Sequence, residues 1–345
     1  MHLSPEFGLT YRIIENDGWR IDARVEMLLS SDTAVGAAKS MGLGLIGFAD
    51  TFERLKPDWI VLVGDRYEIL AAAQAALVAA IPVAHACGGD RTEGAFDEAI
   101  RHSITKMAHL HFVTNEASAR RVRQLGEEPD RIFNVGSLSV DTIRRTALLS
   151  RTEVERELQF PFRAKNLLVT FHPVTLLPDG GLEELTELLA SLAGLADGFG
   201  LIFTMPNADP AGRALAGRIE EFVASREGAQ MYSSLGQQLY LSTVAQVDVM
   251  VGNSSSALYE APTLKRAAVN VGCRQRGRLM ASSVISCPAE QEAITQAIQT
   301  ALRLDCSTAV NPYGDGHAAE RIVAVLKRRL PRQRLLQKTF VDLTA

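Results

Sequence analysis

The stretch HACGGDRTEGAFDEAIRH, from His85 to His102, crowds together side chains that can exchange protons. It holds four acids, two arginines, two histidines and three glycines. Clustered carboxylates raise one another's proton affinity, so one of them could act as a base near neutral pH. The alternative is that the acids only complement the positive end of a helix that starts here. The candidate general acids or bases are Asp90, Glu93, Asp97 and Glu98.

Two shorter segments place polar groups directly after apolar runs. VGDRYE puts Asp65 and Arg66 behind the run WIVLVG, and VTFHPVT puts His172 behind LLVTF. Asp65 could instead cap a helix, with Arg66 as a surface arginine. For His172 a functional role is favoured, because parallel sheets bind ligands at the carboxyl ends of their strands.

The segment GNSSSALYEAP, residues 252–262, predicts an anion site. A strand ends, a turn follows and a helix starts, so hydroxyls and backbone N–H groups gather at a positive helix end. This arrangement suits a diphosphate, with Glu260 placed to accept from ribose hydroxyls; a serine-rich helix cap is the alternative. This segment matches neither GxxxxGK[ST] nor GxGxxG, which disfavours a nicotinamide cofactor. The turn residues are Asn253, Ser254, Ser255 and Ser256.

Apolar runs of strand length alternate with segments of helical period, which implies parallel sheets covered on both faces. The loop GCRQRGR, which contains Arg274, leaves one of these strands as a second anion-facing loop. The expected strands are 59–64, 81–87, 111–114, 132–136, 167–173, 201–207, the apolar part of 246–256, and 267–272. The expected helices are 67–80, 96–110, 117–126, 182–196, 210–225, 257–264, 288–303 and 317–329.

The pattern breaks near residues 150–165, which predicts two doubly wound α/β domains. Residues 1–155 form the first Rossmann-like domain, with the acid cluster, and residues 165–315 the second, with the nucleotide-binding segments. Residues 316–345 form a C-terminal helix and tail that pack back on the first domain. A shared cleft at the carboxyl ends of the strands would then hold the ligand.

Composition excludes several classes of protein. The 345 residues are 47% hydrophobic and carry a formal net charge of −4, without a basic stripe that would indicate nucleic acid. No apolar run approaches the roughly 20 residues that span a bilayer, and no signal peptide opens the chain. The four cysteines are scattered, and the histidine spacing matches no metal motif. These features predict a cytoplasmic protein that binds neither nucleic acid nor membrane and needs no metal or cofactor.

The chain resembles the hydrolysing UDP-N-acetylglucosamine 2-epimerases of the sialic- and legionaminic-acid pathways, from residue 1 to about residue 330. The resemblance implies a two-domain fold of the glycosyltransferase-B type with an interdomain cleft. It also implies conversion of a UDP-linked 2-acetamido sugar to a free 2-epimeric sugar plus UDP, by a homodimer or homotetramer. The motifs that carry the resemblance are GDRYE, IPVAHACGGDRTEGAFDEAIRHSITKMAHLHF, TFHPVT, MPNAD, GNSSSALYEAP and GCRQRGR.

Roles follow from the resemblance by position. Asp65 and Asp97 match catalytic carboxylates, and His172 matches the histidine near the leaving group. Cys87 stands where relatives often have a glutamate, so Asp90 is assigned the second proton transfer. The positions that match nucleotide-contacting residues are Arg66, Asn207, Ser254, Ser255, Glu260 and Arg274.

Two other functions stay open. One is a retaining glycosyltransferase of the same architecture, although transfer to an acceptor does not require the acids of the GGDRTEGAFDE stretch. The other is an inactive sugar-nucleotide-binding protein. This alternative arises because the family begins with a strand, a phosphate loop and a helix, whereas this chain opens with MHLSPEFGLT, which relatives place after those elements.

Overall fold

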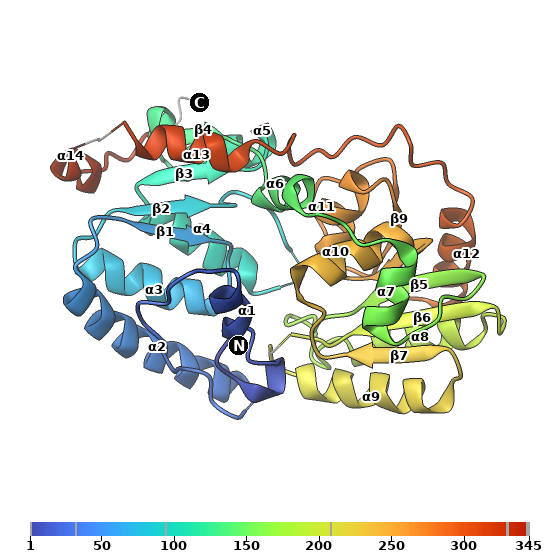
Figure 1. Cartoon of the computed structure of the whole chain (residues 1–345). Coiled ribbons are helices and arrows are strands. Elements are labelled where there is room, and N and C mark those ends of the chain that lie inside the picture. The colour runs from blue at the N-terminus through green and yellow to red at the C-terminus, as the bar shows by residue number, and fades with distance from the viewer. Residues whose placement is uncertain (1, 32, 94, 208, 329–330, 343–345) are drawn as a thin grey trace. The chain divides into compact units, whose positions relative to one another are not determined.

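The computed structural model describes residues 2–31, 33–93, 95–207, 209–328 and 331–342. Gly94 of the acidic stretch, Ala208 of MPNAD and the end of the predicted helix 317–329 lie outside these ranges. The chain forms two compact units: Met1–Arg20 with Thr142–Pro312, and Ile21–Asp141 with Tyr313–Ala345. We call the first the six-stranded unit and the second the four-stranded unit, after their sheets (Figure 1).

The four-stranded unit contains a parallel sheet in the order β1-β2-β3-β4. Strands β2 and β3 are buried along their whole length, and apart from His85 and His111 their residues are apolar. Helices α2, α3 and α4 cover one face, and the alanines of α3 let it pack closely there. The bounds are β1 (Ile60–Val63), β2 (Val83–Ala86), β3 (Leu110–Val113), β4 (Ile132–Asn134), α2 (Ala34–Leu55), α3 (Tyr67–Val78), α4 (Asp97–Met107), α5 (Glu116–Gln124) and η2 (Pro129–Arg131).

The other face of this sheet is covered by residues from the end of the chain (Figure 1). Helices α13 (Ala318–Leu326) and α14 (Arg332–Leu336) pack there through Ile322 and Leu335. The buried carboxylate of Asp141 accepts hydrogen bonds from the N–H groups of Ala318 (2.8 Å) and Ala319 (2.7 Å), which caps α13. Covering this face therefore requires a segment about 180 residues further along the chain than β4.

The six-stranded unit contains a parallel sheet in the order β10-β9-β8-β5-β6-β7. Helices α8, α9 and α12 cover one face, and α7, α10 and α11 the other. The strand order runs outward in both directions from β5 and β8, so the topological switch point lies between these two strands. The strands are β5 (Lys165–Thr170), β6 (Phe199–Thr204), β7 (Ala229–Tyr232), β8 (Val249–Gly252), β9 (Ala267–Val271) and β10 (Val284–Cys287).

The six-stranded unit contains two segments that the sequence assigns to the first domain, residues 2–20 and 142–155. The Glu6 carboxylate binds Arg213 of α9 through two 3.0 Å contacts, and Val154 of α7 is fully buried in the core of this unit. The bounds are η1 (Pro5–Phe7), α1 (Tyr11–Asn16), α7 (Arg151–Leu158), α8 (Leu182–Ala193), α9 (Gly212–Ser225), α10 (Gly236–Gln246), α11 (Ser256–Thr263) and α12 (Gln291–Ala301); α6 (Leu138–Arg145) spans the division between the units.

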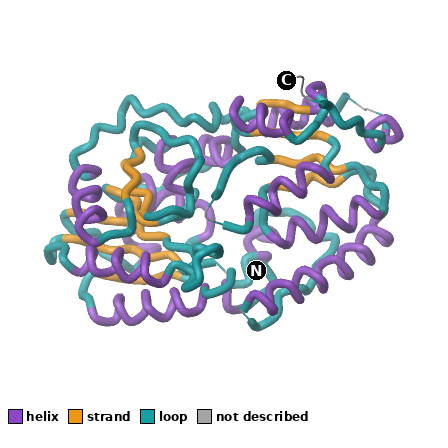
Figure 2. The backbone as a smooth tube through the Cα atoms, turned by 180° about the vertical axis from the view of Figure 1, so that it is seen from behind, coloured by secondary structure: helices purple, strands orange, loops and turns teal. Residues whose placement is uncertain are grey.

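Figure 2 shows helices on both sides of each sheet. The predicted fold class, an α/β fold with two parallel sheets flanked by helices, is therefore confirmed. Among the described residues, no helix has both the length and the apolar character needed to cross a bilayer.

Candidate functional site

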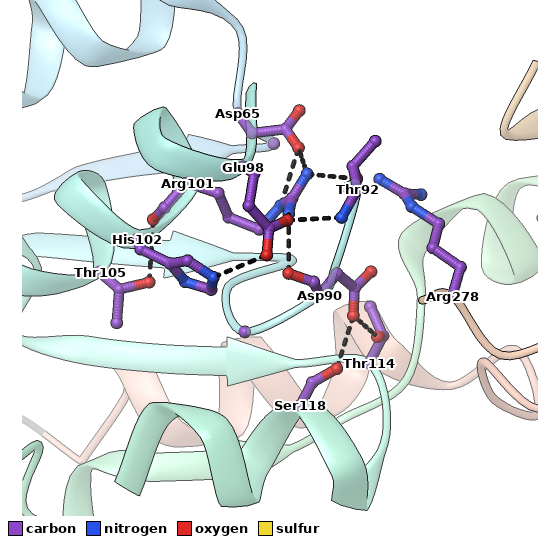
Figure 3. Close-up of polar contacts among 12 residues, drawn as sticks. Asp65, Asp90, Thr92, Glu98, Arg101, His102, Thr105, Thr114, Ser118 and Arg278 are labelled. Carbon is purple, nitrogen blue, oxygen red and sulfur yellow. Dashed lines mark hydrogen bonds and ion pairs between the residues drawn. The ribbon is translucent and has the colours of Figure 1, made fainter. Parts of the chain in front are cut away.

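Arg101 organises the acidic stretch of the four-stranded unit (Figure 3). Its side chain is 1% exposed, and its guanidinium donates to four acceptors from three segments. These acceptors are the Asp65 carboxylate, the Asp90 carbonyl oxygen at 2.7 Å, the Glu98 carboxylate at 2.8 Å and the Thr92 hydroxyl at 2.7 Å. The arginine thus ties the loop after β1, the loop after β2 and the first turn of α4 together.

The N-cap position of the helix after β1 is not occupied by Asp65, which was the alternative for this residue. The N-cap position of α3 is Arg66, and the Asp65 carboxylate instead accepts from the guanidinium of Arg101, with Nε at 2.8 Å. Arg66 lies over the ring of Tyr67 and 3.5 Å from the Glu68 carboxylate. The structure therefore turns Asp65 toward the acid cluster.

Glu98 is a brace for the cluster and not one of its proton donors. Burial opposes its ionisation, but hydrogen bonds from His102 and the Thr92 N–H, with the charge of Arg101, lower its pKa to about 2. Glu98 is therefore ionised throughout the neutral range and is a poor base. Asp97, beside it, is the first residue of α4 and is buried. Glu93 forms an ion pair with Arg91 near the surface.

Asp90 is buried in the loop after β2. Its Oδ1 accepts from the hydroxyls of Thr114 (2.9 Å) and Ser118 (2.6 Å), which come from the next strand and helix (Figure 3). Cys87 at the start of this loop has a φ of +69°, which is costly for a residue with a side chain. Neither hydroxyl stands out in the sequence, although together they orient Asp90.

Gly89 allows this loop to approach α5, and its replacement by alanine is expected to be strongly destabilising. Its φ is +77°, and an added Cβ would lie 2.3 Å from the carbonyl oxygen of Ser118. The left-handed backbone and the forced shift together should lower the free energy of unfolding by about 2–4 kcal/mol. Urea denaturation measures this loss.

Gly42→Ala is the matched control for Gly89→Ala. An added Cβ at Gly42 meets nothing within 4 Å, and this glycine lies inside α2. Alanine should therefore stabilise the protein by about 0.5–1 kcal/mol, because it favours helix. Equal urea midpoints for both variants would contradict the tight fit described for Gly89.

The histidines of the acidic stretch and of β3 have separate partners. His85 contacts the carbonyl oxygen of Gly64 at 2.8 Å, and His102 contacts Glu98 at 3.2 Å. The Val83 N–H donates to His109 Nδ1 at 3.1 Å, and His111 contacts the buried carboxylate of Glu127 at 2.9 Å. Within the described ranges, no three His, Cys, Asp or Glu side chains lie close enough to hold a metal ion.

The buried His85 should make the protein less stable as pH falls below neutrality. Burial, only partly offset by the hydrogen bond to Gly64, lowers its pKa to about 4, against about 6.5 in an unfolded chain. Between these values the unfolded chain binds more protons, so the free energy of unfolding decreases from about pH 6.5 to about pH 4. Urea denaturation at pH 7 and pH 5 should show this decrease.

In His85→Gln the decrease between pH 7 and pH 5 should be smaller. It should not vanish, because burial, followed by the charges of Lys338 and Arg131, also lowers the pKa of His109 to about 4. A decrease of the same size in the variant and in the wild type would show that His85 does not titrate as described.

In the six-stranded unit, His172 and Asn253 meet across the switch point between β5 and β8. The Asn253 side chain accepts from the His172 N–H (2.7 Å) and donates to the His172 carbonyl oxygen (2.8 Å). Asn253 is fully buried and therefore holds the two loops together. Because open α/β sheets bind ligands at this point, the pair marks the expected ligand edge of the unit.

His172 is held in one tautomer by the loop after β6. The backbone N–H of Asn207 donates to His172 Nδ1 at 3.2 Å, so the neutral ring carries its proton on Nε2. The side-chain oxygen of Asn207, Oδ1, is buried, and no hydrogen-bond donor reaches it among the described residues. His172 can therefore offer an N–H donor from Nε2.

The three serine hydroxyls of the turn after β8 differ in their contacts. The Ser254 hydroxyl accepts from the Ser256 N–H at 3.3 Å, and the Ser256 hydroxyl accepts from Tyr240 at 2.5 Å. Burial, followed by the charge of Glu260 on α11, raises the pKa of Tyr240, which keeps it a donor. Among the described contacts, the Ser255 side chain makes no capping bond to α11. The serine-cap alternative thus applies to Ser254 and not to Ser255.

Arg274, in the loop after β9, closes the same edge. Its Nε donates to the Pro173 carbonyl oxygen at 3.2 Å, and a second nitrogen lies 3.4 Å from the Asn253 carbonyl oxygen. The Gln275 side chain donates to the same oxygen at 2.8 Å. The structure thus brings His172, Asn207, Asn253 and Arg274 together at the ends of four neighbouring strands.

These contacts define an α/β protein with an arginine-centred carboxylate cluster in one unit. In the other unit, His172, Asn207, Asn253 and Arg274 lie together at the strand ends. The family model for UDP-N-acetylglucosamine 2-epimerase matches residues 1–327. The chain therefore belongs to the UDP-N-acetylglucosamine 2-epimerase family, and the resemblance of its motifs is confirmed.

Two curated relatives are similar over nearly the whole chain. A GDP/UDP-N,N'-diacetylbacillosamine 2-epimerase (hydrolyzing) from Campylobacter jejuni is 38% identical, with 99% of this chain and 89% of the relative covered. A UDP-N,N'-diacetylbacillosamine 2-epimerase (hydrolyzing) from Legionella pneumophila is 34% identical, with 98% and 89% covered. Relatives of this chain are thus UDP-sugar 2-epimerases.

Solved structures share the fold. The Methanocaldococcus jannaschii UDP-GlcNAc 2-epimerase in complex with UDP-GlcNAc and UDP has a TM-score of 0.78 at 19% identity, over 91% of this chain and 87% of that one. The Neisseria meningitidis enzyme bound to UDP-GlcNAc has a TM-score of 0.77 at 18% identity, over 93% and 89%. At such low identity the likeness establishes the fold alone.

Proposed function

We propose that this family member is a hydrolysing 2-epimerase, which converts UDP-N-acetylglucosamine or a related UDP-linked 2-acetamido sugar to the free 2-epimer and UDP. The observation that carries the proposal is the gathering of the Asp65 carboxylate, the Asp90 loop and the start of α4 around Arg101. Such a cluster suits proton transfer at carbon, and both curated relatives described above are named as hydrolysing enzymes.

The reaction balances without an oxidant or reductant. A base takes the proton from C2 while the bond from C1 to the UDP oxygen breaks, which leaves a glycal and UDP. Water then adds across the new double bond: its hydroxyl joins C1, and a proton joins C2 from the opposite face. The two proton transfers occur on opposite faces of the ring, so they require two differently placed acid–base groups.

We assign the proton transfers to the four-stranded unit. Asp65 and Asp97 are the proposed acid–base pair, and Asp90 is the proposed second donor at C2. Asp90 is suited to this role because the hydroxyls of Thr114 and Ser118 fix its orientation through one carboxylate oxygen. Glu98 is assigned to bracing, because its pKa of about 2 makes it a poor base.

We assign the leaving group to the six-stranded unit. The departing diphosphate develops negative charge, which preorganised donors stabilise. His172 offers an Nε2 proton, since its Nδ1 accepts from the Asn207 N–H. Asn253 fixes the loops that carry these groups. The other proposed contacts to the nucleotide from this unit are Asn207, Ser254, Ser255, Ser256, Glu260 and Arg274. Arg66, which belongs to the four-stranded unit, is also a proposed nucleotide contact.

Turnover in deuterated water tests this proposal. The expected products from UDP-N-acetylglucosamine are UDP and a free sugar that carries deuterium at C2. In ¹⁸O-labelled water the released UDP should stay unlabelled, because the bond that breaks is C1–O and not P–O. UDP release only after an acceptor is added would instead show a glycosyltransferase, and binding without turnover would show a sugar-nucleotide-binding protein.

The same assay ranks substrates. UDP-N-acetylglucosamine and the UDP- and GDP-linked N,N'-diacetylbacillosamines should be compared by kcat/KM, because relatives of this chain carry names of both sugar types. The homodimeric or homotetrameric state and the cytoplasmic location remain predictions, and light scattering after size-exclusion chromatography checks the first.

A further inference from the structure

His85 lies under the loop that carries Asp65. It is the third residue of β2, is 0% exposed and faces Leu62 across the sheet. Its Nε2 lies 2.8 Å from the carbonyl oxygen of Gly64, and the Gly64 N–H donates to the Ala86 carbonyl oxygen at 3.1 Å. Both backbone groups of Gly64 are therefore bonded to neighbouring residues of β2.

The position of Gly64 determines where Asp65 points. Gly64 has a φ of +86°, so the chain turns sharply there between β1 and α3. Rotation of the peptide that joins Gly64 to Asp65 would swing the Asp65 carboxylate away from Arg101, whose Nε lies 2.8 Å from it. The hydrogen bond to the Gly64 carbonyl oxygen opposes that rotation directly.

The state of the His85 ring follows from its surroundings. Burial lowers the pKa of His85 to about 4, so the ring is neutral at neutral pH. A carbonyl oxygen can only accept, so the single ring proton lies on Nε2. Gly88 leaves space for the other nitrogen, because a Cβ there would come within 3.1 Å of His85 Nδ1. The ring thus packs against the loops on both sides of it.

We propose that His85 is a positioning residue of the reaction, which holds the Gly64–Asp65 turn through an Nε2–H···O bond so that Asp65 meets Arg101. This proposal rests on the proposed function, in which Asp65 transfers a proton. It assigns His85 no contact with the substrate.

Two substitutions separate the hydrogen bond from the packing. His85→Gln keeps a side-chain N–H that can reach the Gly64 carbonyl oxygen, whereas His85→Met fills similar space without a donor. In His85→Met, hydrogen exchange at the Gly64 and Asp65 amides should accelerate about tenfold, as expected for one lost hydrogen bond. The kcat for UDP release should fall about tenfold with KM within about twofold. In His85→Gln, exchange and kcat should stay within about threefold of the wild type.

His109→Met is the matched control. His109 is also buried in this unit, but its partner is the Val83 N–H and not Gly64. The His109→Met variant should have a lower melting temperature, but hydrogen exchange at the Gly64 and Asp65 amides should not accelerate. The same acceleration in His109→Met, or equal effects of His85→Gln and His85→Met, would overturn the positioning role.

A measurement on the wild type tests the proposal even if the variants fail to fold. The ¹⁵N shifts of the His85 ring should show a neutral imidazole with its proton on Nε2 at pH 7, and a proton on Nδ1 would overturn the proposal. If the wild type released no UDP, the proposed function would fail, whereas the exchange and ring measurements would still decide the role of His85.

Discussion

Arg101→Met is expected to destabilise the four-stranded unit and to remove most of the activity. Methionine fills a similar volume but donates nothing. The carboxylates of Asp65 and Glu98 would lose their common counter-charge, and the Asp90 carbonyl oxygen would lose its 2.7 Å donor. Removal of one partner from a buried ion pair typically costs about 3–5 kcal/mol, and we expect about 3 kcal/mol because both carboxylates are partly exposed.

Turnover should fall as well as stability. Arg101 would no longer hold Asp65 and the Asp90 loop in position relative to each other. Misplacement of a reacting group by about 1 Å can cost about 100-fold in rate. Urea denaturation and UDP release measure the two effects separately. Arg101→Lys should recover part of the stability but little of the rate, since one ammonium cannot span acceptors from three segments.

Arg121→Met is the control for this substitution. Arg121 donates to the Gly89 carbonyl oxygen at 2.7 Å, so it touches the same loop. Only one hydrogen bond to a neutral group is lost, and the expected change is about 1–2 kcal/mol with a rate close to that of the wild type. If Arg101→Met had the same urea midpoint as the wild type, the central role of Arg101 would be wrong.

Asp97→Asn and Asp65→Asn are expected to reduce kcat by about 10²–10⁴-fold each, the usual contribution of a positioned acid or base. Asparagine has nearly the same shape as aspartate but cannot take up the C2 proton. Deuterium incorporation at C2 and UDP release should fall together, because proton removal and departure of UDP are coupled in the proposed elimination.

Two glutamates of the same stretch serve as controls for the aspartates. Glu93→Gln should keep the rate within about twofold, because its exposed ion pair with Arg91 contributes little. Glu98→Gln should mainly lower stability, because it removes the charge that binds Arg101. If both Asp65→Asn and Asp97→Asn retained full activity, the assignment of the acid–base pair would be wrong.

Much of the fold could be predicted from the alternation of buried strands and helices. Strands such as β2 and β3 are buried on both faces and mostly apolar, which gives a clear signal. Strands β7 and β10 were not predicted from the sequence. Each has four residues, and none of them is fully buried, so neither strand stands out from a loop. The packing of residues 2–20 with the six-stranded unit depends on distant contacts such as Glu6 with Arg213.

The site was predictable where chemistry coincides with the end of a strand, and less so where one side chain links several segments. Arg101 follows Glu98 by three residues, a spacing typical of surface ion pairs on helices, so the sequence gives no reason to expect it at the centre. Ser254 and Ser255 are adjacent and chemically alike, and only the turn geometry separates the hydroxyl that holds the turn from the one that does not cap α11.

Helix α13 covers one face of the four-stranded sheet, but the ribosome makes this helix long after the sheet. Ribosomes add about 5–20 residues per second, so α13 emerges roughly 10–40 s after β4. During that time the face that includes Phe112 and Val135 lacks the helix that later covers it. Nascent chains of this protein should therefore bind holding chaperones until α13 reaches Asp141, even though every strand of that sheet has already been made.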